Sequence, residues 1–250
     1  MEALTYDKTT ALRWGVWDAI DQYRNPTNVN RPNVVRITDQ ELLNAVRAGP
    51  FSAEIMEQFL KEYEVFRYPL NVLEGRDVRL RDIANIIDDK YSPKEGRNAT
   101  EELPVLWWGA VENVRSRLAG EFTGKQYHMR SMCMKLLWFY EPSKATMWDR
   151  HVVAGLNIWQ KLNLKTGITR PQQASEFLDA FGLTFSECAE YIQQLLATVR
   201  KSETGMDYPY PRRVLDKALW FIGASASEQA ALLDRCRADL ERWSWFEANG

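Results

Sequence analysis

Histidine and cysteine are scarce in this chain of 250 residues, which holds only two histidines, His128 and His151, and three cysteines. A metal centre built from histidines needs more ligands than these two supply. Three widely spaced cysteines exclude a disulfide framework and any site that requires four cysteines, metal or iron–sulfur. We therefore expect a protein that works without a metal ion or a cofactor.

Long apolar runs are missing as well. The longest uninterrupted run is five residues, from Leu136 to Tyr140, too short to cross a bilayer. Residues 1–10 lack the basic start and apolar stretch of a secretory signal. With 45% hydrophobic and 26% charged residues, the composition is typical of a soluble globular protein. The sequence thus predicts a cytoplasmic protein without a membrane partner, as one large domain or two lobes that share a core.

The net charge of −2 argues against a nucleic-acid partner, because such proteins usually carry a basic face. However, the charge is unevenly distributed. Residues 113–170 hold ten lysines or arginines and three acidic residues, a net charge of +7, so the rest of the chain is at −9. Two interpretations stay open. The cluster is either a set of solvated helix faces or a cationic groove with acidic flanks.

Helical periodicity of apolar residues runs through nearly the whole chain, and no stretch alternates with period two for long enough to be a strand. Thr9 or Thr10 can cap the first helix, Thr38 with Glu41 forms a capping-box pattern, and Ser52 can open the third helix. The sequence predicts an all-α fold of about ten helices. We expect them over residues 12–23, 38–49, 52–63, 77–90, 105–118, 130–140, 149–162, 171–181, 184–200, 214–222 and 228–245, with Thr184 or Ser186 at the start of the helix that ends at residue 200.

The segment 92–100, SPKEGRNAT, is the most linker-like part of the chain. We expect residues 1–250 to form a single helical unit, in which this segment is a candidate boundary between two lobes.

Residues 132–140, MCMKLLWFY, place a single lysine, Lys135, among eight apolar residues. A helix that is apolar on every face is buried, whereas lysine is almost never fully buried without a partner. Burial also disfavours the ammonium form, which is how lysines become nucleophiles. The alternative is that Lys135 extends past its neighbours to solvent.

Asp149 stands where the next helix is expected to begin, which is a favoured N-cap position. The positive end of the helix dipole stabilises an ionised carboxylate there. Pro142 ends the helix of Lys135, and a tight turn can bring the amine towards Asp149. The spacing fits a pair of amine nucleophile and carboxylate, and it fits equally a structural cap with a nearby salt bridge.

These two helices resemble the 8-oxoguanine DNA glycosylase-like branch of the helix-hairpin-helix DNA glycosylase superfamily, over about 25 residues. The residues that carry the resemblance are Ser131-x-x-x-Lys135-Leu-Leu-x-Phe139-x-x-Pro142 and Met147-Trp148-Asp149-Arg150-x-Val152. The resemblance implies an all-α fold in which Lys135 attacks the sugar C1′ and forms a Schiff base. It implies that Asp149 helps to activate the lysine and stabilises positive charge on the sugar. A bifunctional member also cleaves the strand by β-elimination.

Two features depart from the family's pattern. The family's Leu-Pro-Gly-x-Gly hairpin, which binds a DNA phosphate, is replaced here by residues 120–130, GEFTGKQYHMR. The spacing of 14 residues between Lys135 and Asp149 is also shorter than in the classical enzymes. Phosphate binding would then fall to Lys125 and Arg130. Three further candidates for contacts with nucleic acid lie at the starts of the helices expected over 130–140 and 149–162. They are Ser131, Arg150 and His151.

A flipped base needs a pocket with flat side chains, and the chain has ten tryptophans. Most aromatics at helical spacing belong to the core. Trp148, next to Asp149, is the first pocket candidate, and the others are Trp138, Tyr210 and Arg213. Arg213 is the first residue of a segment that resembles the glycosylase-like motif more weakly, Arg213-Val-Leu-Asp216-Lys-Ala-Leu-Trp220.

Two hypotheses from different classes follow. The first is a DNA N-glycosylase, with or without AP-lyase activity, that removes a modified purine such as 8-oxoguanine; its partner is DNA or, alternatively, a modified nucleobase or nucleotide. The second is a catalytically inactive helical scaffold that binds nucleic acid or protein, as in a bacterial defence or modification system. A purely protein-binding module is a third option.

Overall fold

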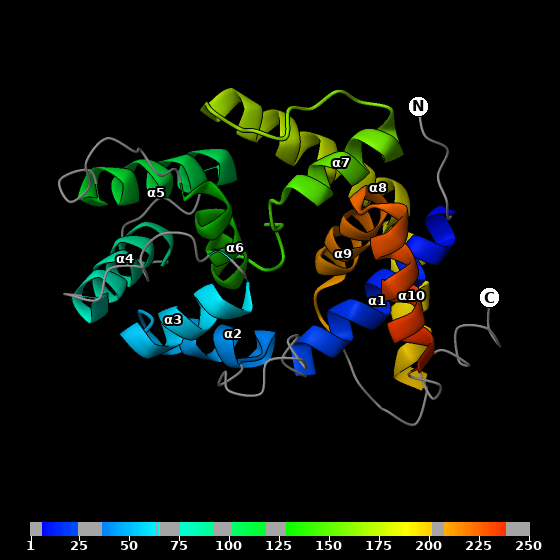
Figure 1. Cartoon of the computed structure of the whole chain (residues 1–250), viewed down its shortest axis with the longest axis horizontal. Coiled ribbons are helices and arrows are strands. Elements are labelled where there is room, and N and C mark those ends of the chain that lie inside the picture. Colours follow the sequence, from blue (N-terminus) through cyan, green and yellow to red (C-terminus); the bar gives the residue numbers. More distant parts are fainter. Residues whose placement is uncertain are drawn as a thin grey trace. The chain divides into compact units, whose positions relative to one another are not determined.

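The computed structural model describes residues 7–24, 37–63, 65, 76–92, 102–118, 129–201 and 208–238. Within these ranges the fold is all-α, as predicted, with ten helices and no strand (Figure 1). The helices are α1 (Lys8–Arg24), α2 (Asp39–Ala48), α3 (Ala53–Glu62), α4 (Arg76–Tyr91), α5 (Leu103–Leu118), α6 (Arg130–Tyr140), α7 (Arg150–Gln160), α8 (Pro171–Lys201), α9 (Pro211–Gly223) and α10 (Ala226–Ala238). None of the described helices is long and apolar enough to span a membrane.

The helix starts show how well local signals predict this fold. Thr38 and Glu41 form the predicted capping box of α2, and Ser52 accepts a hydrogen bond from the Ile55 amide at the start of α3. The first helix differs from the prediction. Asp7, and not Thr9 or Thr10, caps it by accepting a hydrogen bond from the Thr10 amide at 2.6 Å.

The largest difference from the predicted helices is α8. Two helices were expected over 171–181 and 184–200, and the structure has one continuous helix from Pro171 to Lys201. Thr184 and Ser186 do not act as caps. Their hydroxyls donate to the carbonyls of Ala180 and Gly182, four residues earlier, so the helical backbone continues through them.

The chain divides into two compact units, which are described separately. Unit 1 comprises residues 1–20, 146–169 and 175–250, and unit 2 comprises residues 21–145 and 170–174. The candidate lobe boundary at 92–100 does not coincide with this division. Residues 93–100 lie outside the described part, and the helices on either side, α4 and α5, pack together within unit 2.

The core of unit 2 is built around α6, which packs against α2, α4 and α5. Residues 132–134 and 136–139 of this helix are buried. Hydrogen bonds join it to two neighbours. The Tyr91 hydroxyl of α4 donates to the Cys133 carbonyl at 2.9 Å, and the Trp107 indole of α5 donates to the Arg130 carbonyl at 2.9 Å. This helix is therefore held firmly in the middle of its unit.

The core of unit 1 is the crossing of α7 and α9, which touch over more of their length than any other pair of helices in the described residues. Glycines allow the close approach. A Cβ atom on Gly155 would lie 1.9 Å from the Leu219 carbonyl oxygen, and one on Gly223 would lie 1.9 Å from the His151 carbonyl oxygen. Larger side chains at either position would force the two helices apart.

Candidate functional site

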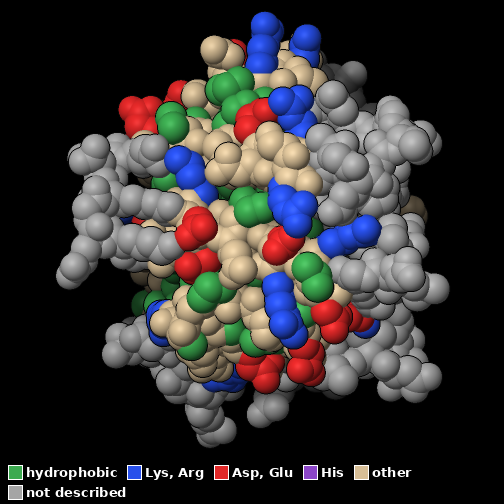
Figure 2. Space-filling view, turned by 90° about the vertical axis from the view of Figure 1, so that its left-hand side faces the viewer, with side chains coloured by type: hydrophobic (Ala, Val, Ile, Leu, Met, Phe, Trp, Pro, Cys, Tyr) green, Lys and Arg blue, Asp and Glu red, His purple; other side chains and the backbone are tan. Residues whose placement is uncertain are grey.

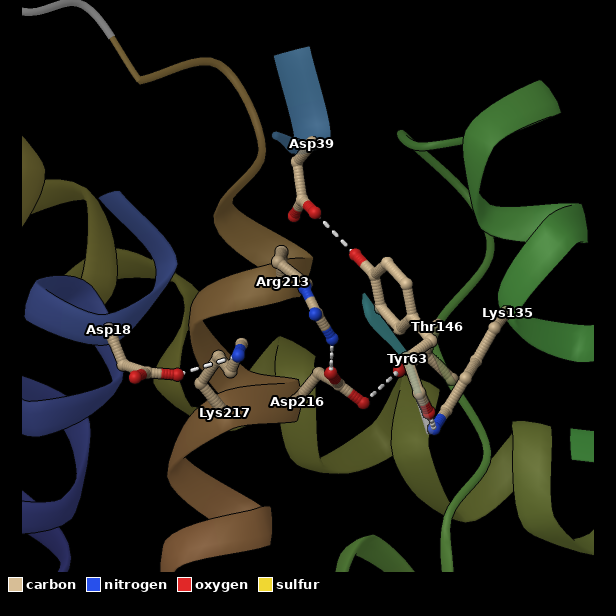
Figure 3. Close-up of polar contacts among 8 residues, drawn as sticks. All are labelled: Asp18, Asp39, Tyr63, Lys135, Thr146, Arg213, Asp216 and Lys217. Atoms are coloured by element: carbon tan, nitrogen blue, oxygen red, sulfur yellow. Dashed lines mark hydrogen bonds and ion pairs between the residues drawn. The ribbon is translucent and has the colours of Figure 1, made fainter. Parts of the chain in front are cut away.

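The sequence left open whether Lys135 is buried or extends to solvent. In the structure it is half-buried, and the other residues of 132–139 are buried. Its amine neither lies deep in the core nor extends freely into water. Lys135 Nζ donates to the main-chain carbonyl of Tyr63 at 3.3 Å and lies 5.7 Å from the centroid of the Tyr63 ring (Figure 3). Tyr63 is the C-cap of α3, so the amine is held at the C-terminus of that helix. A cation is stabilised there by the helix dipole and the terminal carbonyls.

Asp149 is the N-cap of α7, as its position in the sequence predicts. Its backbone is extended, with φ −145° and ψ 158°, and its side chain accepts a hydrogen bond from the His151 amide at 2.9 Å. The carboxylate therefore satisfies one of the unpaired N–H groups of the first turn. The residue as a whole is half-buried.

The two candidate catalytic residues belong to different units. Lys135 lies on α6 in unit 2, and Asp149 starts α7 in unit 1. That the two form one site remains a prediction from the sequence.

The candidate phosphate contacts next to Lys135 lie at the start of α6. Arg130 and Ser131 are half-buried there, and Lys125 lies outside the described residues. Burial lowers the pKa of Arg130 from its usual value, while the nearby Glu112 acts in the opposite direction. An arginine that is already partly desolvated loses less hydration when it binds an anion, which suits a phosphate contact.

Arg150 and His151, at the start of α7, differ in exposure. Arg150 is exposed and its Nε lies 3.3 Å from His151 Nε2. The His151 ring is half-buried, with Nδ1 3.1 Å from the Gly223 carbonyl and its centroid 5.1 Å from that of Trp220. These contacts join α7 to α9, so His151 contributes to the packing of unit 1, whereas Arg150 is available to a ligand.

Three of the four candidate pocket residues are buried. Trp138 is fully buried and packs edge-on against Phe139 in unit 2. In unit 1, Tyr210 is buried with its ring 5.7 Å from Tyr208, and Arg213 forms a buried ion pair with Asp216. These positions are typical of core residues. Trp148, which is half-buried, is the pocket candidate that keeps exposed surface.

The ion pair of Arg213 belongs to a group of buried charges on α9 (Figure 3). The Thr146 hydroxyl donates to Asp216 at 3.2 Å. Lys217 Nζ lies 2.6 Å from the Asp18 carboxylate, whose other oxygen accepts from Arg235 at 2.8 Å. Burial raises the pKa of Asp216, and its neighbours Arg213 and Lys217 oppose that rise. Each carboxylate of this group is paired with a cation of the same unit, which indicates a structural role.

The basic cluster at 113–170 is partly neutralised in the structure. Arg115 pairs with Glu112 at 2.5 Å and Arg117 pairs with Asp82 at 2.5 Å. Lys161 and Lys165, after α7, are exposed. On the face drawn in Figure 2, basic and acidic side chains are interspersed, and neither sign forms a continuous patch. The basic side chains visible on that face do not line one groove.

Two residues that contact the candidate site have no local signal in the sequence. Tyr63 lies 72 residues before Lys135, and Asp39, which accepts a hydrogen bond from the Tyr63 hydroxyl, lies 24 residues before Tyr63. The helical periodicity of apolar residues cannot indicate such contacts, because they depend on how α2, α3 and α6 pack.

Metal binding has no visible basis in the part of the chain that the structure describes, where no group of three His, Cys, Asp or Glu residues could hold an ion. No protein-family model, no curated protein and no solved structure matches this chain.

Proposed function

We propose that this protein is a DNA N-glycosylase that removes a modified purine such as 8-oxoguanine, with Lys135 as nucleophile and Asp149 as its carboxylate partner. The observation that supports this most is the placement of Lys135. Lys135 is flanked on both sides by buried residues of α6, and contacts with Tyr63 hold its amine at a defined position. A nucleophile must be held in this way, because small displacements from the attack geometry cost large factors in rate.

The reaction needs only an amine and a carboxylate. The neutral Lys135 amine uses its lone pair to form a bond to C1′ of the sugar. The bond between C1′ and the base nitrogen breaks, and the base leaves with that electron pair and takes up a proton. The attached amine gives up one proton. The sugar ring then opens, O4′ takes up a proton from water, and a protonated Schiff base remains on Lys135.

The carboxylate has two tasks in this scheme. It favours removal of the proton from the attacking amine, and it stabilises the positive charge that develops on the sugar as the base departs. The N-cap position of Asp149 suits both tasks, because the first turn of α7 holds the carboxylate in place through the His151 amide. An AP-lyase step extends the proposal. Loss of the proton at C2′ of the Schiff base would break the strand on its 3′ side by β-elimination.

Borohydride trapping tests the proposal, since borohydride reduces a protein–DNA Schiff base to a stable amine. Three duplexes are compared that carry 8-oxoguanine, an abasic site, or only normal bases. We expect trapping with the first two and little with the third. Lys135→Gln should lower the trapped fraction by about 100-fold or more, because a missing nucleophile removes the covalent path. Lys144→Gln is the matched control, as Lys144 is an exposed lysine just after the same helix.

A catalytically inactive scaffold that binds nucleic acid or protein is the second proposal. It is favoured by the contact of Lys135 with the carbonyl at the end of α3, which is also what a structural lysine does. Exposed Arg150, Lys161 and Lys165 would supply its phosphate contacts. Salt-sensitive DNA binding without any trapped adduct would favour this scaffold over the enzyme. Binding that does not respond to salt would contradict a phosphate-binding surface in either proposal.

A further inference from the structure

A chain of three residues from three different parts of unit 2 ends at the Lys135 amine (Figure 3). It starts at Asp39, the first residue of α2, continues through Tyr63 at the end of α3, and reaches Lys135 on α6. Asp39 and Tyr63 are buried and Lys135 is half-buried. The three residues are far apart in sequence and meet only because these helices pack together.

Tyr63 holds the Lys135 amine with two of its groups. The main-chain carbonyl accepts the hydrogen bond from Nζ at 3.3 Å, and the aromatic ring lies 5.7 Å from the same nitrogen. A cation within about 6 Å of an aromatic centroid is attracted by the ring's quadrupole. Because both contacts come from one residue, a shift of Tyr63 would change two contacts of the amine at once.

Tyr63 is in turn fixed at its far end. Its hydroxyl donates a hydrogen bond to the Asp39 carboxylate, which lies in the first turn of α2 beside the Thr38–Glu41 capping box. The N-terminal end of the helix dipole stabilises a carboxylate there. The Tyr63 ring also packs between Phe59 and Phe139, at centroid distances of 5.1 and 5.7 Å. These contacts fix the orientation of the Tyr63 ring beside the amine.

We propose that Tyr63, anchored by Asp39, is a positioning residue that places the Lys135 amine for attack. This inference rests on the proposed glycosylase function and adds two residues to its machinery. The Asp39 carboxylate contacts the Tyr63 hydroxyl, and Tyr63 contacts the amine. The order of contacts therefore predicts that changes at Asp39 and at the Tyr63 hydroxyl have the same kind of effect on Lys135.

The kinetic test measures single-turnover trapping on an abasic duplex at saturating protein. Tyr63→Phe and Asp39→Ala should slow trapping by about tenfold or more with little change in DNA affinity, because the amine loses its alignment. Asp39→Asn keeps an acceptor for the Tyr63 hydroxyl and should recover most of the rate that Asp39→Ala loses. A role in stability alone would not produce this recovery in rate at unchanged affinity.

The matched control is Tyr91→Phe. Tyr91 is also a buried tyrosine of unit 2 whose hydroxyl bonds to α6, but it bonds to the Cys133 carbonyl. This variant should lose similar stability and keep the trapping rate. Equal slowing by Tyr63→Phe and Tyr91→Phe, or no slowing by Tyr63→Phe, would overturn the inference.

A measurement without DNA separates this inference from the proposed function. A small acylating reagent labels exposed amines, and mass spectrometry gives the labelling rate of Lys135 relative to the exposed Lys144. Tyr63→Phe and Asp39→Ala should raise this ratio several-fold because the residue that holds the amine loses its anchor, whereas Tyr91→Phe should not. If the parent protein traps no DNA but the ratio changes as expected, the glycosylase proposal fails and the positioning of Lys135 stands. An unchanged ratio would contradict the positioning.

Discussion

Among the described helices, α6 of unit 2 and α9 of unit 1 are largely buried and each carries a lysine, but the two lysines have different contacts. On α9, Lys217 lies 2.6 Å from the Asp18 carboxylate, with 12% of its side chain exposed, and the neighbouring Arg213 pairs with Asp216. On α6, Lys135 is held by a main-chain carbonyl and an aromatic ring. Opposite charges that are buried together are costly to separate, whereas a hydrogen bond to a carbonyl is exchanged for another partner at small cost.

This difference indicates a division of roles. The charges of α9 contribute to the stability of unit 1, and in the proposed reaction the lysine of α6 exchanges its present contacts for the sugar. Changes on α9 should therefore affect unfolding strongly. Changes at Lys135 should affect chemistry strongly and unfolding weakly.

The largest effect on stability is expected from Arg213→Met, which leaves the buried Asp216 carboxylate without its guanidinium. Breaking a buried pair by removing one partner costs about 4 kcal/mol. Urea unfolding measures the loss. The double variant Arg213→Met with Asp216→Leu should recover much of it, because no buried charge is then left over. A loss below about 1 kcal/mol in the single variant would show that α9 does not depend on this pair.

The pH dependence of Arg213→Met should have a definite sign. Burial already raises the pKa of Asp216, and without Arg213 the pKa should rise further. A carboxyl whose folded pKa lies above its unfolded value makes the folded state less stable as the pH rises between the two values. The variant should thus lose more stability at pH 8 than at pH 5, relative to the parent. Equal losses at both values would contradict this assignment.

The packing of α7 against α9 gives the next largest effect. Gly155→Ala would place a methyl group 1.9 Å from the Leu219 carbonyl oxygen, so the helices must separate, at about 3 kcal/mol. Gly182→Ala is the control, because a Cβ there meets no atom within 4 Å and alanine favours the helix. Thermal unfolding should show a lower Tm for the first variant and an unchanged or higher Tm for the second. Equal behaviour would contradict the close crossing.

Replacing each lysine with methionine compares the two helices directly. Lys217→Met should cost about 2 kcal/mol, since Asp18 keeps Arg235 as a partner but loses the closer cation. Lys135→Met should cost about 1 kcal/mol or less, because it removes a hydrogen bond to a carbonyl and leaves the buried segment apolar. Urea unfolding of both variants checks the order. The reverse order would refute the division of roles.

The smallest effect concerns an exposed carboxylate of unit 1. Hydrogen bonds from the Ser225 hydroxyl and amide lower the pKa of Glu228 below its usual value of 4.5. Its contribution to stability is therefore present above that value and is lost as the pH falls through the folded pKa. Ser225→Ala should weaken this dependence, and unfolding at a series of pH values down to about 3 would show it. The pH dependence of stability that Glu228 contributes is therefore opposite in sign to the one expected for Asp216.

Local signals in the sequence predicted much of the fold. The capping box of Thr38 and Glu41, the bounds of α6 and the N-cap Asp149 all follow from short-range patterns, and the structure confirms them. The break expected near Thr184 was wrong, because a serine or threonine inside a helix can bond back to a carbonyl one turn earlier. Nothing in the local sequence distinguishes that arrangement from a cap.

The contacts of the candidate site were harder to predict from the sequence than the helices. The half-burial of Lys135 follows from its neighbours, but its contact with Tyr63 depends on tertiary packing. Arg213 had a local signal that favoured structure over binding. Asp216 lies three residues later, the spacing of an ion pair on one helix face. Trp138, at the centre of α6, is buried for the same reason as its apolar neighbours.

Mapping the adduct is the most direct test of the different roles of α6 and α9. The protein is trapped with borohydride on an abasic duplex, digested with a protease, and the modified peptide is identified by mass spectrometry. Our account predicts that the reduced sugar is attached to Lys135. An adduct on Lys217 or another amine, or a parent protein that forms no adduct, would contradict it.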